Sequence, residues 1–155
     1  MVSRPETLDA VKEALTRRGR TVVAVQGRSM FPTLKHGTRV EVHPVAFDEL
    51  RIGDLVVFSN GRTLICHRLI RKTRRLCFLK GDTNLWTDPP VIWGQVLGRV
   101  TRVIHEDLRI QSIDAPHQRL LAALLAHLSY PYAIYYNALH YFGACRWWAK
   151  GIHME

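Results

Sequence analysis

The chain has 155 residues and a formal net charge of +9, from 22 Lys and Arg residues against 13 Asp and Glu residues. This length fits one domain that buries a core of its own without disulfides or a structural metal. The positive charge suggests a nucleic acid, an anionic membrane surface or an acidic peptide as partner, and it serves solubility equally well. The three cysteines, at positions 66, 77 and 145, form no zinc-type cluster, so we expect reduced thiols in a cytoplasmic protein.

Residues 1–20 form the first of three predicted segments. Leu8, Val11 and Leu15 recur at helical spacing, and Gly19 is a typical helix stop. The segment lacks the continuous apolar run of a secretory signal. We therefore predict a short amphipathic helix here and expect a setting other than ordinary secretion.

Residues 21–115 predict a mainly β domain. Short runs of β-branched and apolar residues alternate with turn signals, as is typical of antiparallel strands. The predicted strands are 21–26, 38–43, 55–59, 63–71 and 76–80, followed by a long, bent β-rich segment at 91–105. The fold class that this pattern favours is an antiparallel β-barrel or sandwich.

Residues 116–155 differ in composition from the rest of the chain. No Asp, Glu, Lys or Arg occurs from Leu120 to Cys145, and leucines recur there at helical spacing. Three interpretations stay open. Two helices that meet near Pro131 and pack on the β domain or in a homodimer are favoured, and the alternatives are a helix in the membrane interface or a membrane-spanning helix.

Three short stretches contain the residue types that nucleophilic catalysis requires. They are Gly-Arg-Ser-Met-Phe-Pro-Thr-Leu at 27–34, Cys-His-Arg at 66–68, and Lys-Gly-Asp-Thr-Asn-Leu-Trp-Thr-Asp at 80–88. A serine hydroxyl needs a base that accepts its proton, and a neutral imidazole suits this role near neutral pH. A carboxylate then fixes the imidazole tautomer. Each residue also has an ordinary explanation, as a turn serine, a structural histidine and a turn-forming aspartate.

In this order, the three motifs resemble the signal peptidase I family, over about residues 25–102. The His-Arg pair, where bacterial members have Lys-Arg, resembles the endoplasmic-reticulum and archaeal branch of that family. The resemblance implies Ser29 as nucleophile, with its own N–H in the oxyanion hole, and His67 as general base. It implies Asp88 as the acid of the triad, and Asp82 as a site-shaping acid or a second group that orients His67. No metal or organic cofactor is implied.

Some positions depart from the family pattern. Thr38 stands where the family usually has Asp, and Thr87 precedes a single Asp88 where the family often has paired acids. The identity of the triad acid therefore stays open between Asp82 and Asp88. For Arg68 we expect a structural ion pair.

The resemblance predicts a serine endopeptidase that cleaves a leader or signal-like segment from an extended precursor peptide. The alternative is a non-catalytic module on the same fold that binds peptide, membrane or nucleic acid. Self-cleavage is a further alternative, because related self-cleaving repressor domains share this fold, although they use a lysine base. The expected partners are a precursor peptide, a membrane surface contacted through the C-terminal segment and a second copy of the chain. A nucleic acid is not expected.

Overall fold

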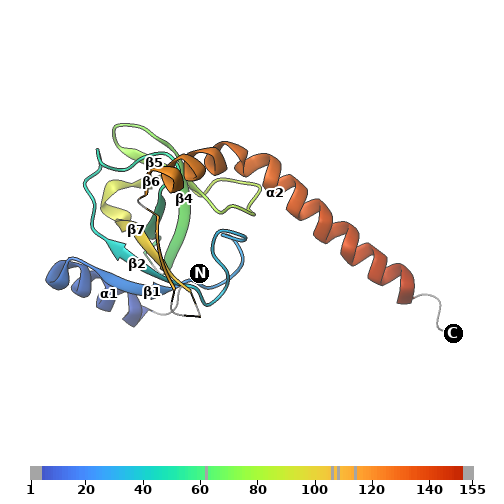
Figure 1. The fold of residues 1–155 in the computed structure, drawn as a ribbon, viewed down its shortest axis with the longest axis horizontal. Helices are drawn as coiled ribbons and strands as arrows, with labels where there is room; N and C mark the ends of the chain where they lie inside the picture. The colour runs from blue at the N-terminus through green and yellow to red at the C-terminus, as the bar shows by residue number, and fades with distance from the viewer. Residues whose placement is uncertain (1–4, 62, 106, 108, 114, 152–155) are drawn as a thin grey trace.

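The computed structural model describes residues 5–151, apart from residues 62, 106, 108 and 114. A curled antiparallel sheet forms the body of the molecule (Figure 1). The N-terminal helix α1, Pro5–Arg18, lies against one side of this body. The long C-terminal helix α2, Pro116–Gly151, crosses another side and continues away from it.

The sheet has eight strands, and the structure confirms the mainly β fold class. Their order is β1-β2-β7-β3-β4-β5-β6, with β8 paired to β7. The long segment predicted at 91–105 divides into two strands around a short 3₁₀ turn, Trp93–Gln95. The strands are β1 Thr21–Ala24, β2 Arg39–His43, β3 Leu55–Ser59, β4 Leu64–Lys72, β5 Leu76–Lys80, β6 Val91–Ile92, β7 Val96–Ile104 and β8 Ile110–Ser112.

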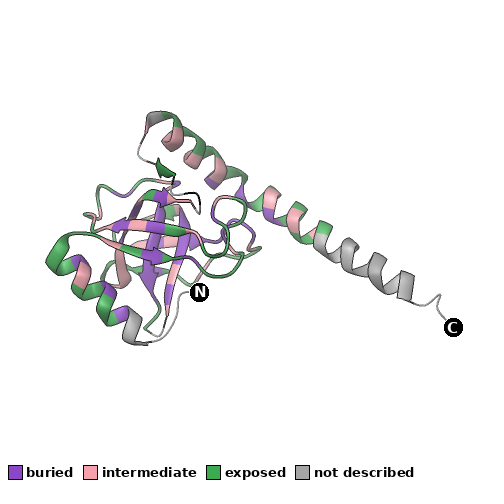
Figure 2. Ribbon diagram, turned by 60° about the horizontal axis from the view of Figure 1, so that its bottom comes forward, coloured by how far each residue is buried: buried purple, intermediate pink, exposed green. Residues whose placement is uncertain are grey.

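Strand β3 lies between two hydrophobic clusters and is buried along its whole length (Figure 2). Successive side chains of a strand point to opposite faces. Val57 accordingly joins the cluster that includes α1, whereas Val56 and Phe58 join the other cluster, with Leu69 and Leu79. Strand β4 pairs with β3 on one side and β5 on the other, so its residues occupy a rigid, central position in the sheet.

Helix α2 is one continuous helix, so the prediction of two helices that meet near Pro131 is wrong. A proline within a helix costs about 3 kcal/mol, because it removes a hydrogen bond and its ring crowds the preceding turn. Contacts with the body on both sides of Pro131 offset this cost. Lys80 Nζ donates to the Ser129 carbonyl at 2.9 Å, and Asn137 Nδ2 donates to the Thr83 carbonyl at 2.9 Å. Among the described residues, no helix is both long enough and apolar enough to cross a membrane.

Gly53, in the turn before β3, lies close to the backbone of α2. Its φ is +97°, and a Cβ atom at this position would lie 2.6 Å from the backbone carbon of Ala122 in α2. A side chain here would therefore meet both backbone strain and the helix itself.

We expect Gly53→Ala to lower the free energy of unfolding by more than about 1 kcal/mol, through the left-handed backbone and the displaced helix together. The matched control is Gly61→Ala, since Gly61 also has a positive φ, +89°, but open space around it. Urea unfolding of both variants measures the difference. Equal losses would contradict a tight packing of α2 on Gly53.

Candidate active site

Ser29 lies in the loop between β1 and β2. Two buried side chains, Met30 and Leu34, fix this loop in the core, and the Leu34 N–H donates to the Met30 carbonyl at 2.8 Å. At the base of the loop, the Val25 N–H donates to the Thr38 carbonyl at 2.8 Å. Ser29 itself is half-buried, next to the fixed Met30. The hydroxyl therefore sits on an ordered turn at the surface of the core.

The segment after β5 packs directly against the Ser29 loop. The Thr83 N–H donates to the Ser29 carbonyl at 2.9 Å, and Thr83 Oγ1 donates to the Arg28 carbonyl at 3.1 Å. A Cβ atom on Gly81 would lie 2.9 Å from Ser29 Cβ, so a side chain does not fit there. The roles of Gly81 and Thr83 have no signal in the sequence, because they depend on contact between segments more than 50 positions apart.

His67, on β4, connects Ser29 to Asp88. Its Nε2 atom is 3.1 Å from Ser29 Oγ, and its Nδ1 atom is 2.6 Å from Asp88 Oδ2. With the ring proton on Nδ1, His67 donates to the carboxylate and accepts from the serine hydroxyl. Asp88 is held by its own N–H, which donates to the Leu79 carbonyl of β5 at 2.9 Å. The three side chains thus have the connectivity that general-base activation of a serine requires.

Asp82 is bound to Arg68 instead of His67, and the predicted ion pair of Arg68 is confirmed. Arg68 Nε and Nη2 donate to the two oxygens of the Asp82 carboxylate, each at 2.8 Å. Thr33 Oγ1 donates to Asp82 Oδ2 at 2.6 Å, and Arg68 Nη1 donates to the Gly53 carbonyl at 3.0 Å. Both charged side chains are almost completely buried. This pair therefore ties together the Ser29 loop, β4 and the segment after β5.

Cys66, the neighbour of His67, is buried and free, as is Cys77, in agreement with the prediction of reduced thiols. Burial raises the pKa of the Cys66 thiol to about 12. The thiolate, which is the nucleophilic form, is therefore scarce near neutral pH. Cys145 lies outside the residues whose side chains the structure describes.

Lys80, at the end of β5, is a buried basic side chain that contacts α2 and not Ser29. Its ammonium group donates to the Ser129 carbonyl of α2 at 2.9 Å and to the Gly81 carbonyl at 3.2 Å, and it lies 5.0 Å from the centre of the Tyr130 ring. Burial lowers the pKa of Lys80. These contacts direct the ammonium toward α2, where it anchors the helix to the end of β5.

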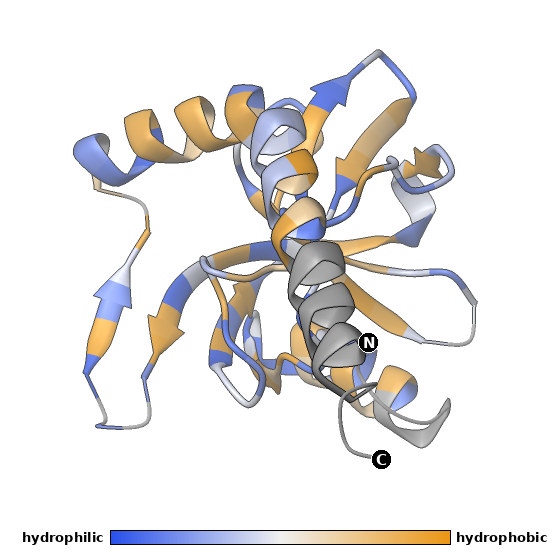
Figure 3. Cartoon of the chain, turned by 90° about the vertical axis from the view of Figure 1, so that its right-hand side faces the viewer, coloured by the Kyte–Doolittle hydropathy of each residue, from blue (hydrophilic) through white to orange (hydrophobic). Residues whose placement is uncertain are grey.

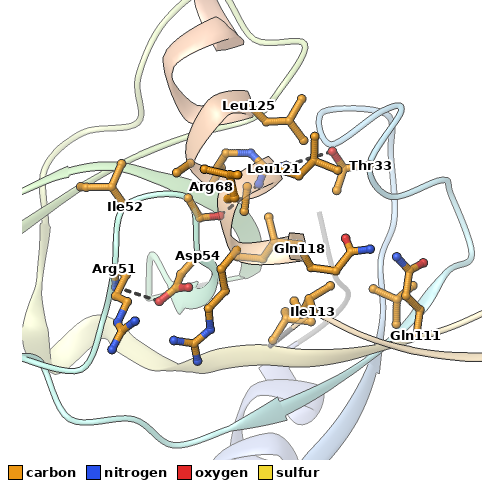
Figure 4. A pocket seen from close by; sticks show the side chains of 18 of the residues that line it. Thr33, Arg51, Ile52, Asp54, Arg68, Gln111, Ile113, Gln118, Leu121 and Leu125 are labelled. Carbon is orange, nitrogen blue, oxygen red and sulfur yellow. Dashed lines mark hydrogen bonds between the residues drawn. The ribbon is translucent and has the colours of Figure 1, made fainter. Parts of the chain in front are cut away.

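A cavity of about 490 Å³ lies between the sheet and the first half of α2 (Figure 4). Thr33 and Arg68 line it, together with Leu121 and Leu125 of α2. Ser29 and His67 are absent from its lining. The cavity thus borders the buried ion pair through Arg68 and does not include the serine.

A smaller cavity of about 380 Å³ adjoins the Ser29 loop itself. Phe31 and Tyr136 provide aromatic walls, and Arg28, Lys35 and His36 provide basic groups. The Phe31 and Tyr136 ring centres are 5.9 Å apart, so α2 forms one side of this cavity. Within the described part of the chain, no group of three or more His, Cys, Asp or Glu side chains is arranged to hold a metal ion.

A family model described as Peptidase S24-like matches residues 3–85, which is more than half of the chain. The matched region contains Ser29, His67 and Asp82, and Asp88 lies just beyond its end. No curated protein matches the chain.

Proposed function

The chain belongs to the Peptidase S24-like family, and from this membership and its site geometry we propose that it is a serine endopeptidase. The observation that carries the proposal is the pair of hydrogen bonds from Ser29 Oγ through His67 to Asp88. Such a pair of bonds is what converts a weak hydroxyl nucleophile into a reactive one. The family fold is that of a serine peptidase, and the three side chains supply chemistry that fits it.

In the proposed mechanism, Ser29 Oγ attacks the carbonyl carbon of a peptide bond while His67 Nε2 takes the hydroxyl proton. Asp88 stabilises the imidazolium, and the Ser29 N–H donates to the developing oxyanion. His67 then gives its proton to the leaving amine as the C–N bond breaks, which leaves an ester on Ser29. Water, deprotonated by His67, hydrolyses this ester and restores the hydroxyl.

We further propose that the substrate is an extended precursor peptide from which a leader segment is removed. Strand β1 is at one edge of the sheet and leads directly into the Ser29 loop. An edge strand can pair with an extended peptide through main-chain hydrogen bonds. A peptide bound along β1 would run toward Ser29, which supports this mode of binding.

The test is labelling with a fluorophosphonate, followed by measurement of the intact mass. We expect one adduct on the wild-type chain and none on Ser29→Ala or His67→Ala. The matched control is Ser112→Ala, an exposed serine on β8 that should leave labelling unchanged. The same mass spectra would also reveal any self-cleavage.

An adduct that persists in Ser29→Ala would contradict the assigned nucleophile. No adduct on folded wild-type protein would favour the alternative function, a non-catalytic peptide-binding module on this fold.

A further inference from the structure

The side of α2 that faces away from the body is mostly apolar, although the helix also exposes His117 and His127. A surface helix normally presents polar and charged side chains to water on this side. In α2 the outward positions are instead 49–66% exposed leucine, isoleucine and tyrosine side chains. We call this surface the outer face, and its main members are Leu120, Leu124, Leu128, Ile134, Tyr135 and Leu139.

The opposite side of α2 is covered by the body, against which Ala126 and Ala133 are buried. In Figure 3 the first half of α2 is mostly orange, that is, hydrophobic. A largely apolar helix face is normally covered rather than left in water. The body covers only the inner side of α2, so the apolar side chains of the outer face remain exposed to water. We therefore expect a binding partner that covers them.

The charge of the chain indicates which partner this is. The sequence of α2 contains no acidic residue, and Arg119 and Arg146 bracket its uncharged stretch. Basic residues also lie beside the helix on the body. Arg51 lines the cavity at the start of α2, and Arg28 and Lys35 line the cavity next to Tyr136.

An apolar strip on a basic chain, with basic groups on the neighbouring body, is complementary to an anionic lipid surface, where acyl chains and negative headgroups lie side by side. Two copies of the chain would instead bring two net charges of +9 together. Exposed tyrosines such as Tyr130 and Tyr135 suit the boundary between headgroups and acyl chains. We therefore propose that the outer face of α2 binds an anionic lipid bilayer, with the helix lying in the plane of the interface.

This arrangement places the serine loop close to the bilayer. The inner side of α2 contacts that loop through Tyr136 and Phe31, whose ring centres are 5.9 Å apart. It also contacts the neighbouring segment through Asn137 and the Thr83 carbonyl. A helix with its side chains is about 10 Å across, so Ser29 would lie about one helix diameter above the membrane surface. If the proposed peptidase activity holds, a precursor whose leader lies on the membrane would meet the site there.

The test is flotation of the full chain with vesicles of equimolar phosphatidylcholine and phosphatidylglycerol, compared with vesicles of phosphatidylcholine alone. We expect the wild type to bind the anionic vesicles and to bind them less at high salt. The double variant Leu124→Glu, Leu128→Glu should lower the partition coefficient by about tenfold or more, since it places charge in the centre of the outer face.

The matched control is Ile92→Glu, Ile110→Glu, which changes two similarly exposed apolar side chains on the sheet. It should bind within about twofold of the wild type, because binding depends on the apolar area that enters the interface. Urea unfolding checks that all variants are folded, independently of serine labelling, so failure of lipid binding and failure of the peptidase proposal are separate results.

Three outcomes would overturn the proposal. They are equal binding to neutral and anionic vesicles, no binding by the folded wild type, and an equal loss in the control variant. A dimer in sedimentation velocity that the Leu124→Glu, Leu128→Glu variant abolishes would show that a second copy covers the face instead.

Discussion

Asp88→Asn is expected to slow acylation of Ser29 by about 1,000- to 10,000-fold while the protein stays folded. The Asp88 carboxylate lies 2.6 Å from His67 Nδ1 and fixes the proton on that nitrogen. An amide of the same shape can instead donate to Nδ1, which shifts the ring proton to Nε2 and leaves the serine without an acceptor. The amide also cannot stabilise the imidazolium that forms during attack.

The measurement is the rate of fluorophosphonate labelling, followed by intact mass over time, with urea unfolding alongside. Asp54→Asn is the matched control, because the side chains of Asp54 and Asp88 have similar exposure, 13% and 17%. Asp54 accepts from the Arg51 N–H and lines the cavity beyond the ion pair. Labelling of Asp88→Asn at the wild-type rate would remove Asp88 from the triad.

Asp82→Ala is expected to have the largest effect on stability, a loss of about 3–5 kcal/mol in the free energy of unfolding. The substitution leaves the Arg68 guanidinium buried without the carboxylate that binds it through two hydrogen bonds. It also removes the acceptor of the Thr33 hydroxyl, which joins the Ser29 loop to this pair.

Urea unfolding measures this loss, and Glu13→Ala is the control. Glu13 forms an exposed ion pair with Arg17 one helical turn away, which should contribute only about 0.3–0.5 kcal/mol. The double variant Arg68→Met, Asp82→Leu should recover part of the stability, because it removes both buried charges. A stable Asp82→Ala variant that no longer labels would instead assign Asp82 to the orientation of His67.

The strands were predicted well where their signals are local. Strands β3 and β5 lie at the predicted residues, because short apolar runs bounded by turn residues need no distant contact to be recognised. The segment at 91–105 was predicted as one element, because its β-rich composition continues through the short 3₁₀ turn at Trp93–Gln95.

The choice between Asp82 and Asp88 could not be made from the sequence. Both acids lie in one short motif, and only the path of the chain after β5 decides which of them reaches His67. That path is fixed by the hydrogen bonds of Thr83 to the Ser29 carbonyl and of the Asp88 N–H to the Leu79 carbonyl. Neither hydrogen bond can be recognised from the residues next to it in the sequence.

Helix α2 was mispredicted for a similar reason. Pro131 is a strong local signal for a helix end. The contacts that offset its cost come from Lys80 and Thr83, which are far away in the sequence. Tertiary contacts of this kind routinely override local propensity.

Because His67 and Arg68 are neighbours on β4, insertions and deletions within this strand should be poorly tolerated during evolution. His67 forms a hydrogen bond with Ser29, and Arg68 forms the ion pair with Asp82 that connects the loops. Each contact requires that the side chain points to its present face of the strand. Inserting or deleting one residue within β4 would exchange the two faces and disrupt both roles at once. Relatives with other substrate preferences should therefore differ in length within segments 26–38 and 81–90, while β4 keeps a constant length.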